Sequence, residues 1–268
     1  MMKNRSALLP VLFATFALVL GLTACGARPK DEGPDYADDE AMAVIAEGLV
    51  ARSDYLDEQQ EAGEDTSSAA HLTKAVQTEL DVVSPLKDRP FEDSKLQESV
   101  IAYVNALNDS LKILEDYPTT SLEFYQKWQE VYGERTGMLK TFADKYELTV
   151  PERFQTTFDE MLAQGGAALS QKETKNAIEQ LVESIDFQKT DDGYGLFTYS
   201  GVGENTTEYD FKDVGLVVSL YDADGVKAEE TYTSTKSWAP GEKVKFEAMS
   251  SVDAANIKVS VNYYNVAD

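Results

Sequence analysis

The chain is predicted to fold as α+β in separate domains: an N-terminal antiparallel helical bundle followed by a small antiparallel β-sandwich of the immunoglobulin-like (Ig-like) kind. Three observations lead to this prediction. Apolar residues recur every three or four positions from residue 40 to about 186, which is the spacing of one buried helix face. Apolar and polar residues alternate in segments from about 194 to 268, as in strands with one buried face. Turn-forming residues separate the segments.

Four or five amphipathic helices are expected in the first half, and the short polar breaks between them imply an antiparallel bundle. The third has the clearest start, because Ser94 and Gln97 match a capping box, in which both side chains satisfy free backbone N–H groups. The fifth begins at Pro151, and Gly165-Gly166 marks a point where it is expected to break or kink. The apolar positions that define these helices include Met42, Ile45, Leu49, Leu72, Val76, Leu80, Leu96, Val100, Val104, Leu107, Leu122, Leu139, Phe142, Phe154, Phe158, Ile178, Leu181 and Val182.

An aromatic stripe within the fourth expected helix has two interpretations. Tyr125, Trp128 and Tyr132 follow one another at helical spacing, so they share one face of that helix. Such a stripe can be a binding platform, but at this spacing it is more often part of a hydrophobic core. The core is the preferred interpretation.

Period-2 alternation predicts the strands of the second half. The clearest are Val214–Leu220, Val244–Ala248 and Ile257–Tyr263, with further strands near Tyr194–Val202 and Val226–Ser234. Asp224-Gly225 is a hairpin signal, and Pro240-Gly241 suits a tight turn. Asp191-Asp192-Gly193 is interpreted as a charged linker between the two halves, and a fragment from about Tyr194 to Asp268 is expected to fold alone.

Turn and core residues of the second half occur in a characteristic order. They are Gly201 and Asn205, then Leu220-Tyr221-Asp222 and Asp224-Gly225, and finally Pro240-Gly241-Glu242 with Phe246. This order resembles the FxLYD domain, a small sandwich of extracytoplasmic bacterial proteins, often lipoproteins of Gram-positive bacteria. The resemblance covers about 75 of the 268 residues and departs at Gly203, where an aliphatic residue would be usual. It implies a fold and brings no catalytic residues.

The first 24 residues have the organisation of a signal peptide. Lys3 and Arg5 form a short basic region, and an apolar run from Ala7 to Leu22 follows that is short for a membrane-spanning helix. The run ends in Leu22-Thr23-Ala24-Cys25. This sequence resembles the bacterial lipobox, in which an aliphatic residue and two small residues precede an invariant Cys.

The lipobox resemblance implies that Cys25 carries a lipid. In that family the Cys sulfur is joined to a diacylglycerol, the peptidase recognises the residues corresponding to Leu22, Thr23 and Ala24, and cleavage leaves the Cys as the new N-terminus. Residues 25–39 are charged and contain Gly and Pro, so they are expected to be a flexible acidic tether with a reach of roughly 20 Å. The alternatives are an ordinary secretory signal with a stray Cys, or an uncleaved anchor.

Catalytic and metal sites are not expected. His71 is the single His and Cys25 the single Cys, so a Ser/His/Asp or Cys/His mechanism, a disulfide and an ordinary zinc site all lack the residues they need. Paired carboxylates could cleave glycosides, but among 48 acidic residues such pairs carry no specificity. Asp222-Ala223-Asp224-Gly225 begins like a calcium loop and lacks its later ligands, so a hairpin is preferred. We therefore expect no cofactor and no metal.

The net charge of −24 becomes −26 when residues 1–24, with two basic and no acidic residues, are removed. A field of that sign repels nucleic acid, so nucleic acid is not expected as a partner. The predicted function is a non-enzymatic binding or interaction module. It is expected to be lipid-anchored on the extracytoplasmic face of a cell membrane. Its expected partner is an envelope protein or polymer that contacts the loops and edges of the sandwich. The alternatives are a ligand-binding accessory lipoprotein, with its site in the bundle or at the domain junction, and a carboxylate-based hydrolase.

Overall fold

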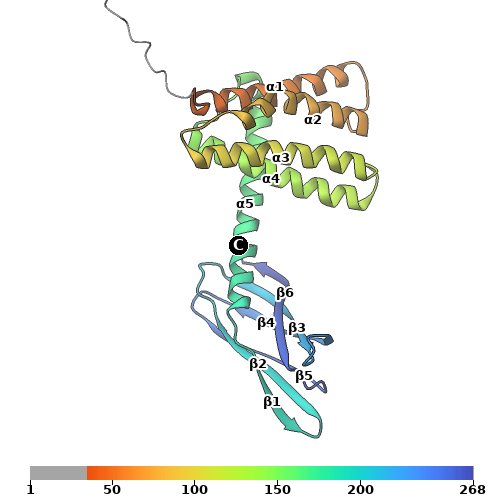
Figure 1. The fold of residues 1–268 in the computed structure, drawn as a ribbon, viewed down its shortest axis with the longest axis vertical. Coiled ribbons are helices and arrows are strands. Elements are labelled where there is room, and N and C mark those ends of the chain that lie inside the picture. The colour runs from red at the N-terminus through yellow and green to blue at the C-terminus, as the bar shows by residue number, and fades with distance from the viewer. Residues whose placement is uncertain (1–34, 268) are drawn as a thin grey trace, which may run out of the picture. The chain divides into compact units, whose positions relative to one another are not determined.

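The computed structural model describes residues 35–267 and shows a mixed α+β protein, in which five α-helices precede two antiparallel sheets (Figure 1). This confirms the predicted succession of helices and strands. All helices and strands of the described residues belong to one compact unit, Tyr36–Asp268. Within residues 35–267 no helix is both long enough and apolar enough to cross a membrane.

Each α-helix packs against the next one along the chain. The helices are α1 (Asp38–Glu61), α2 (Ala69–Val83), α3 (Ser94–Asp116), α4 (Leu122–Tyr146) and α5 (Gln155–Glu183), with 3₁₀ turns η1 (Ser84–Asp88) and η2 (Glu152–Phe154). Their apolar faces form one cluster that runs from Ala37 in the chain to Phe158. Helical periodicity therefore located all five helices.

The start of α3 differs from the predicted capping box. Ser94 is the first helical residue, and the cap is Asp93, whose carboxylate accepts hydrogen bonds from the backbone N–H groups of Lys95 and Leu96 at 2.8 and 3.2 Å. The Gln97 amide donates to the Arg89 carbonyl oxygen instead of reaching back to the cap. A carboxylate is a good N-cap because its charge also favours the helix N-terminus. The cap was therefore predicted one residue too late, and the predicted capping box is absent.

The expected break at Gly165-Gly166 is absent, because α5 continues from Gln155 to Glu183. Gly165 is buried where α5 crosses α4, and a Cβ atom at this position would lie 2.1 Å from the Thr136 carbonyl oxygen. The glycine therefore allows two helix backbones to touch. Its role is packing, and the prediction of a helix break was wrong.

The strands form two three-stranded antiparallel sheets, with the orders β1-β2-β5 and β4-β3-β6. The strands are β1 (Gln188–Gly193), β2 (Leu196–Glu204), β3 (Phe211–Tyr221), β4 (Lys227–Trp238), β5 (Lys243–Ser250) and β6 (Asn256–Val266). The sequence had located the other five strands but not β1. Asp191-Asp192-Gly193 ends β1 and leads into the turn toward β2, so its interpretation as a linker was wrong.

The two sheets share one hydrophobic core and are also joined along one edge. The residues of β3 expected to face inward, Val214, Leu216, Val218 and Leu220, are completely buried. Where β4 runs past β5, the Thr233 hydroxyl accepts a hydrogen bond from the Glu247 N–H at 3.1 Å, and the Thr231 hydroxyl donates to the Met249 carbonyl oxygen. Side chains thus satisfy backbone groups that a neighbouring strand would otherwise pair.

Candidate functional site

The residues predicted from sequence to carry a chemical role lie outside the described part of the chain. Leu22, Thr23, Ala24 and the proposed lipidation site Cys25 all precede residue 35. Lipid attachment and the tether up to residue 34 therefore stay predictions, whereas Asp38 and Asp39, predicted to end the tether, begin α1.

Helix α5 contributes side chains to both hydrophobic cores. Phe158, near its start, is buried in the helical core, whereas Ile178 and Leu181, near its end, are buried among the strands. At 1.5 Å per residue, Phe158 and Ile178 are separated by roughly 30 Å along the helix axis. Between Gln171 and Asn176 every side chain is exposed except that of Thr174. One unbroken helix therefore links the two cores (Figure 1).

The residue Ile185, which follows α5, packs against strand β2. Ile185 is buried, and a Cβ atom on Gly203 of β2 would lie 2.9 Å from its Cδ1 atom and 2.8 Å from the Trp238 ring. On the same strand, a Cβ atom on Gly201 would lie 2.6 Å from the Ile185 Cγ2 atom. Ile185 thus fills, from outside the strand, the space that side chains at positions 201 and 203 would occupy.

One buried carboxylate joins four helices of the bundle. Glu79 of α2 has no exposed surface and accepts hydrogen bonds from Arg52 of α1 at 3.0 Å and Arg135 of α4 at 3.2 Å. The Tyr103 hydroxyl of α3 donates to its other oxygen. Burial favours the neutral acid, but the charges of Arg135 and Arg52 outweigh it, so the pKa of Glu79 lies below its ordinary value. The carboxylate is an ionised cross-link of the bundle with no access to solvent.

The pKa of Tyr103 in the same cluster agrees with this role. Burial raises the pKa of Tyr103 well above its ordinary value, so its hydroxyl stays protonated and can donate. Within residues 35–267, the Nε and Nη1 atoms of Arg135 are buried without a hydrogen-bond partner. Glu79, Tyr103 and Arg135 are at most 2% exposed, so the cluster lies in the interior of the bundle.

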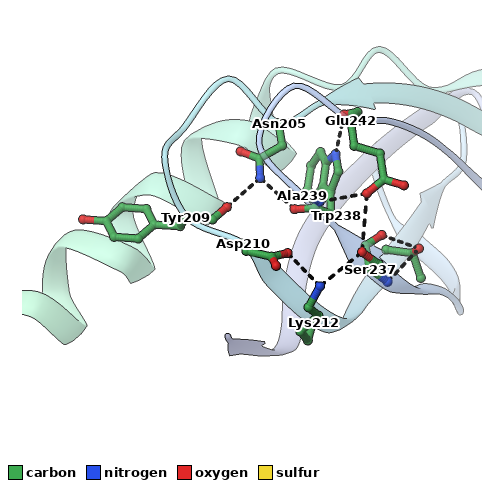
Figure 2. A network of polar contacts seen from close by, with 9 residues as sticks. Asn205, Tyr209, Asp210, Lys212, Ser237, Trp238, Ala239 and Glu242 are labelled. Atoms are coloured by element: carbon green, nitrogen blue, oxygen red, sulfur yellow. Dashed lines mark hydrogen bonds and ion pairs between the residues drawn. The ribbon is translucent and has the colours of Figure 1, made fainter. Parts of the chain in front are cut away.

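A second polar network organises the loops at one end of the sheets (Figure 2). Asn205 is completely buried, and its amide donates to the carbonyl oxygens of Tyr209 and Trp238 at 2.8 and 2.7 Å. The Trp238 indole N–H donates to the Glu242 carbonyl oxygen at 3.2 Å, and the Glu242 carboxylate accepts from the Ala239 N–H at 2.8 Å. Asn205 and Glu242 therefore hold these loops together.

The aromatic stripe of α4 is only partly core. Tyr125 is 61% exposed, which contradicts the core interpretation, while Trp128 and Tyr132 are half-buried and line a shallow groove of about 600 Å³ between α4 and α5. Trp128 also stacks on Phe124, with ring centroids 5.4 Å apart. The groove opens beside the close crossing of the two helices at Gly165.

The remaining polar candidates are occupied by local structure. The Asp222 carboxylate accepts hydrogen bonds from the N–H groups of Asp224 and Val226, both at 2.9 Å, which confirms a hairpin turn. His71 shares a hydrogen bond of 2.8 Å with the Tyr55 hydroxyl. Within residues 35–267, no three His, Cys, Asp or Glu side chains gather closely enough to hold a metal ion.

No protein family and no curated protein matches the chain. Among solved structures, the alkylpurine DNA glycosylase AlkC of Pseudomonas fluorescens, bound to DNA with an abasic site analog, is similar at 12% identity and a TM-score of 0.22. The match covers 82% of this chain and 75% of the other.

This finding corrects two expectations. The similar protein is an enzyme bound to DNA. The sequence, in contrast, predicted a non-enzymatic binding or interaction module, or a ligand-binding lipoprotein. It also predicted that nucleic acid is not a partner. Neither the function nor the set of partners is therefore carried forward. A TM-score of 0.22 equally gives no argument for glycosylase chemistry or DNA binding in this chain.

Proposed function

We propose that this protein is a lipid-anchored structural spacer on the extracytoplasmic face of a bacterial membrane, in which α5 holds the β-region at a fixed distance from the helical bundle. One observation carries the proposal: a single unbroken helix is buried in two hydrophobic cores. A flexible linker would leave the two regions independent, whereas a helix fixed at both ends transmits position and orientation.

Both ends of α5 are tightly fixed. At the bundle end, Gly165 brings its backbone against Thr136 of α4, and α4 is itself tied to three other helices through Arg135 and Glu79. At the other end, Ile178 and Leu181 lie in the core of the sheets. Interiors packed at native density resist deformation, so bending is confined to the exposed turns from Gln171 to Asn176.

The membrane attachment in this proposal rests on the lipobox resemblance of Leu22-Thr23-Ala24-Cys25. Two acyl chains on Cys25 would give stable anchoring, since each buried CH₂ contributes about 0.8 kcal/mol. The proposal also includes an Ig-like sandwich of the FxLYD kind for the β-region, supported by the Asn205 loop network and by the shared core of the two sheets.

Pulsed electron paramagnetic resonance tests the spacer directly. Nitroxide labels at Asp109→Cys of α3 and Asp224→Cys of the β3–β4 turn, in the full chain with Cys25→Ser, should give one narrow distance distribution. Replacing Gln171 and Lys172 by Gly should broaden it, because two helix-breaking residues fall in the exposed turns. Replacement of the same pair by Ala is the matched control and should keep it narrow.

A broad distribution in the chain without the glycines would overturn the spacer proposal. The anchor is tested separately: Cys25→Ala should remove metabolic labelling by fatty acid and move the protein from the membrane fraction to the soluble fraction. Labelling that persists in this variant would contradict lipidation at Cys25 and leave the distance measurement unaffected.

A further inference from the structure

We propose that the outward face of the β4-β3-β6 sheet is a binding platform for a neutral oligosaccharide, built on the rings of Tyr232 and Tyr263. This site lies on a sheet face, away from the loops and edges where the sequence placed a partner. It is independent of the spacer function.

Strand register places both tyrosines on one face. Val217 of β3 pairs with Tyr232 of β4, and Gly215, two residues earlier on β3, pairs with Tyr263 of β6. Directly opposed residues point to the same side of a sheet, as do residues two apart. The alternate β3 residues from Val214 to Leu220 fill the core, so Gly215 and Val217 face outward. The tyrosines flank β3 from its two sides, offset by two strand spacings (roughly 10 Å) across the sheet and by two residues (roughly 7 Å) along it.

Tyr263 is held in place by two local features. The register shifts between Gly215 and Leu216, so β6 carries one additional residue, Asn262, and bulges there. Bulges re-aim side chains and often occur beside functional sites. A Cβ atom on Gly215 would lie 2.3–2.8 Å from three atoms of the Tyr263 ring, so the ring rests directly on the glycine. It is nevertheless 51% exposed, and Tyr232 is 60% exposed.

The surroundings of the tyrosines favour an uncharged ligand. Lys236 pairs with Asp213 at 2.7 Å, Lys227 pairs with Glu230 at 2.7 Å, and the Lys258 ammonium lies 5.2 Å from the centroid of the Tyr221 ring. These cations are engaged within the sheet and are not directed at a free anion. Ser234 and Ser260, which are also exposed on this face, offer hydroxyl groups.

A sugar chain matches this chemistry in two ways. The C–H groups on one side of a pyranose ring are apolar and pack against an aromatic ring, while its hydroxyls need partners that both donate and accept hydrogen bonds. Tyrosine supplies an apolar ring and a hydroxyl in one rigid side chain, and serine hydroxyls donate and accept. Two ring faces on a rigid sheet can therefore hold successive sugar units without a deep pocket.

Isothermal titration calorimetry of the folded protein tests the platform with three uncharged probes: chitohexaose, cellohexaose and maltohexaose. We expect one of them to bind, and Tyr232→Ala and Tyr263→Ala each to weaken that binding at least tenfold. Tyr263→Phe keeps the ring and should bind within about threefold of the parent. Tyr125→Ala, which removes an exposed tyrosine from α4, is the matched control and should leave binding unchanged.

Circular dichroism of each variant checks that the sheets remain folded. The proposal is overturned if none of the three probes binds, or if binding survives in the folded variant lacking both tyrosines. Binding of a single-stranded oligonucleotide to the same face in place of the sugars would also overturn it, because the occupant would then be a stacked base.

Discussion

The helical region and the β-region differ in the polar groups that they bury. The bundle buries a charged cluster at its centre, with Glu79 joined to Arg52, Arg135 and Tyr103. The core of the sheets is apolar, and Asn205, a buried polar residue of this region, lies in the loop after β2. In the sheets, the alternation of apolar and polar residues and the tight turns already fix the strand register. Helix faces can slide and rotate past one another, so the bundle gains specificity from a buried group that only one arrangement satisfies.

Each region carries its own tryptophan, which allows the comparison to be measured region by region. Trp128 lies on α4 and Trp238 at the end of β4, and the chain has two tryptophans in all. A Trp238→Phe background reports the bundle by fluorescence, and a Trp128→Phe background reports the β-region. The following predictions use these two backgrounds.

The largest effect is expected from Glu79→Gln. This change leaves Arg52 and Arg135 buried without a countercharge, and breaking a buried ion pair in this way costs about 3–5 kcal/mol. The urea midpoint reported by Trp128 should fall accordingly. Glu98→Gln, at an exposed position of the neighbouring α3, is the control and should change stability by less than about 0.5 kcal/mol. Equal effects of the two substitutions would contradict the cross-link.

The next effect is expected from Gly165→Ala. The new Cβ atom would meet the Thr136 carbonyl oxygen at 2.1 Å, so α4 and α5 must separate, and overpacking of this kind costs about 2–3 kcal/mol. Gly166→Ala is a matched control on the next residue, where the nearest atom is 3.8 Å away. It should stabilise the helix by about 0.5–1 kcal/mol. Thermal unfolding by circular dichroism measures both, and destabilisation by both would favour a flexible hinge at this point.

A smaller effect, confined to the sheets, is expected from Asn205→Ala. The carbonyl oxygens of Tyr209 and Trp238 would lose their donor, at a cost of about 1–2 kcal/mol. Trp238 fluorescence should report the loss, and Trp128 fluorescence at the same urea concentrations should not. Asn262→Ala, on the exposed bulge of β6, serves as the control. A parallel shift of both tryptophan signals would show that the two regions unfold together.

The smallest effect is the dependence of bundle stability on pH. The folded-state pKa of Glu79 is lowered, so its contribution is fully present above the unfolded pKa of about 4.3 and is lost as the pH falls through the lower folded value. Urea titrations monitored by Trp128 at pH 6 and below pH 4 should therefore show weaker stability at the lower pH. The slope should be shallower in Glu79→Gln. An unchanged slope would show that other carboxylates dominate acid denaturation.

The sequence located elements wherever the pattern was local. Helical spacing and strand alternation gave the five helices and five of the six strands, and Asp224-Gly225 and Pro240-Gly241 became the expected turns. β1 escaped because its residues are almost all exposed, which leaves no alternation to detect. These elements could be predicted because residue spacing and turn residues depend only on neighbours in the chain.

The functional features depend on contacts between distant segments, which a single sequence does not display. Glu79 is one of 48 acidic residues, and nothing in its neighbourhood along the chain marks it as buried. Gly165 looked like a helix breaker because the approach of α4 was not visible. Gly215 and Tyr263 are brought together by the register of β3 and β6. Tyr125 was assigned to the core by spacing alone, which does not show which helix face is covered.

The burial of Ile185 against Gly201 and Gly203 also bears on how this architecture can be exchanged between proteins. A fragment cut at Tyr194 would lack β1 and would leave an apolar hole where Ile178, Leu181 and Ile185 normally lie. A fragment meant to keep this core intact must therefore contain the six strands, Ile185 and the last two turns of α5, and a fusion point for it falls inside a helix rather than in a loop. Any partner domain joined there would inherit its orientation from the phase of that helix, about 100° for each residue inserted or deleted.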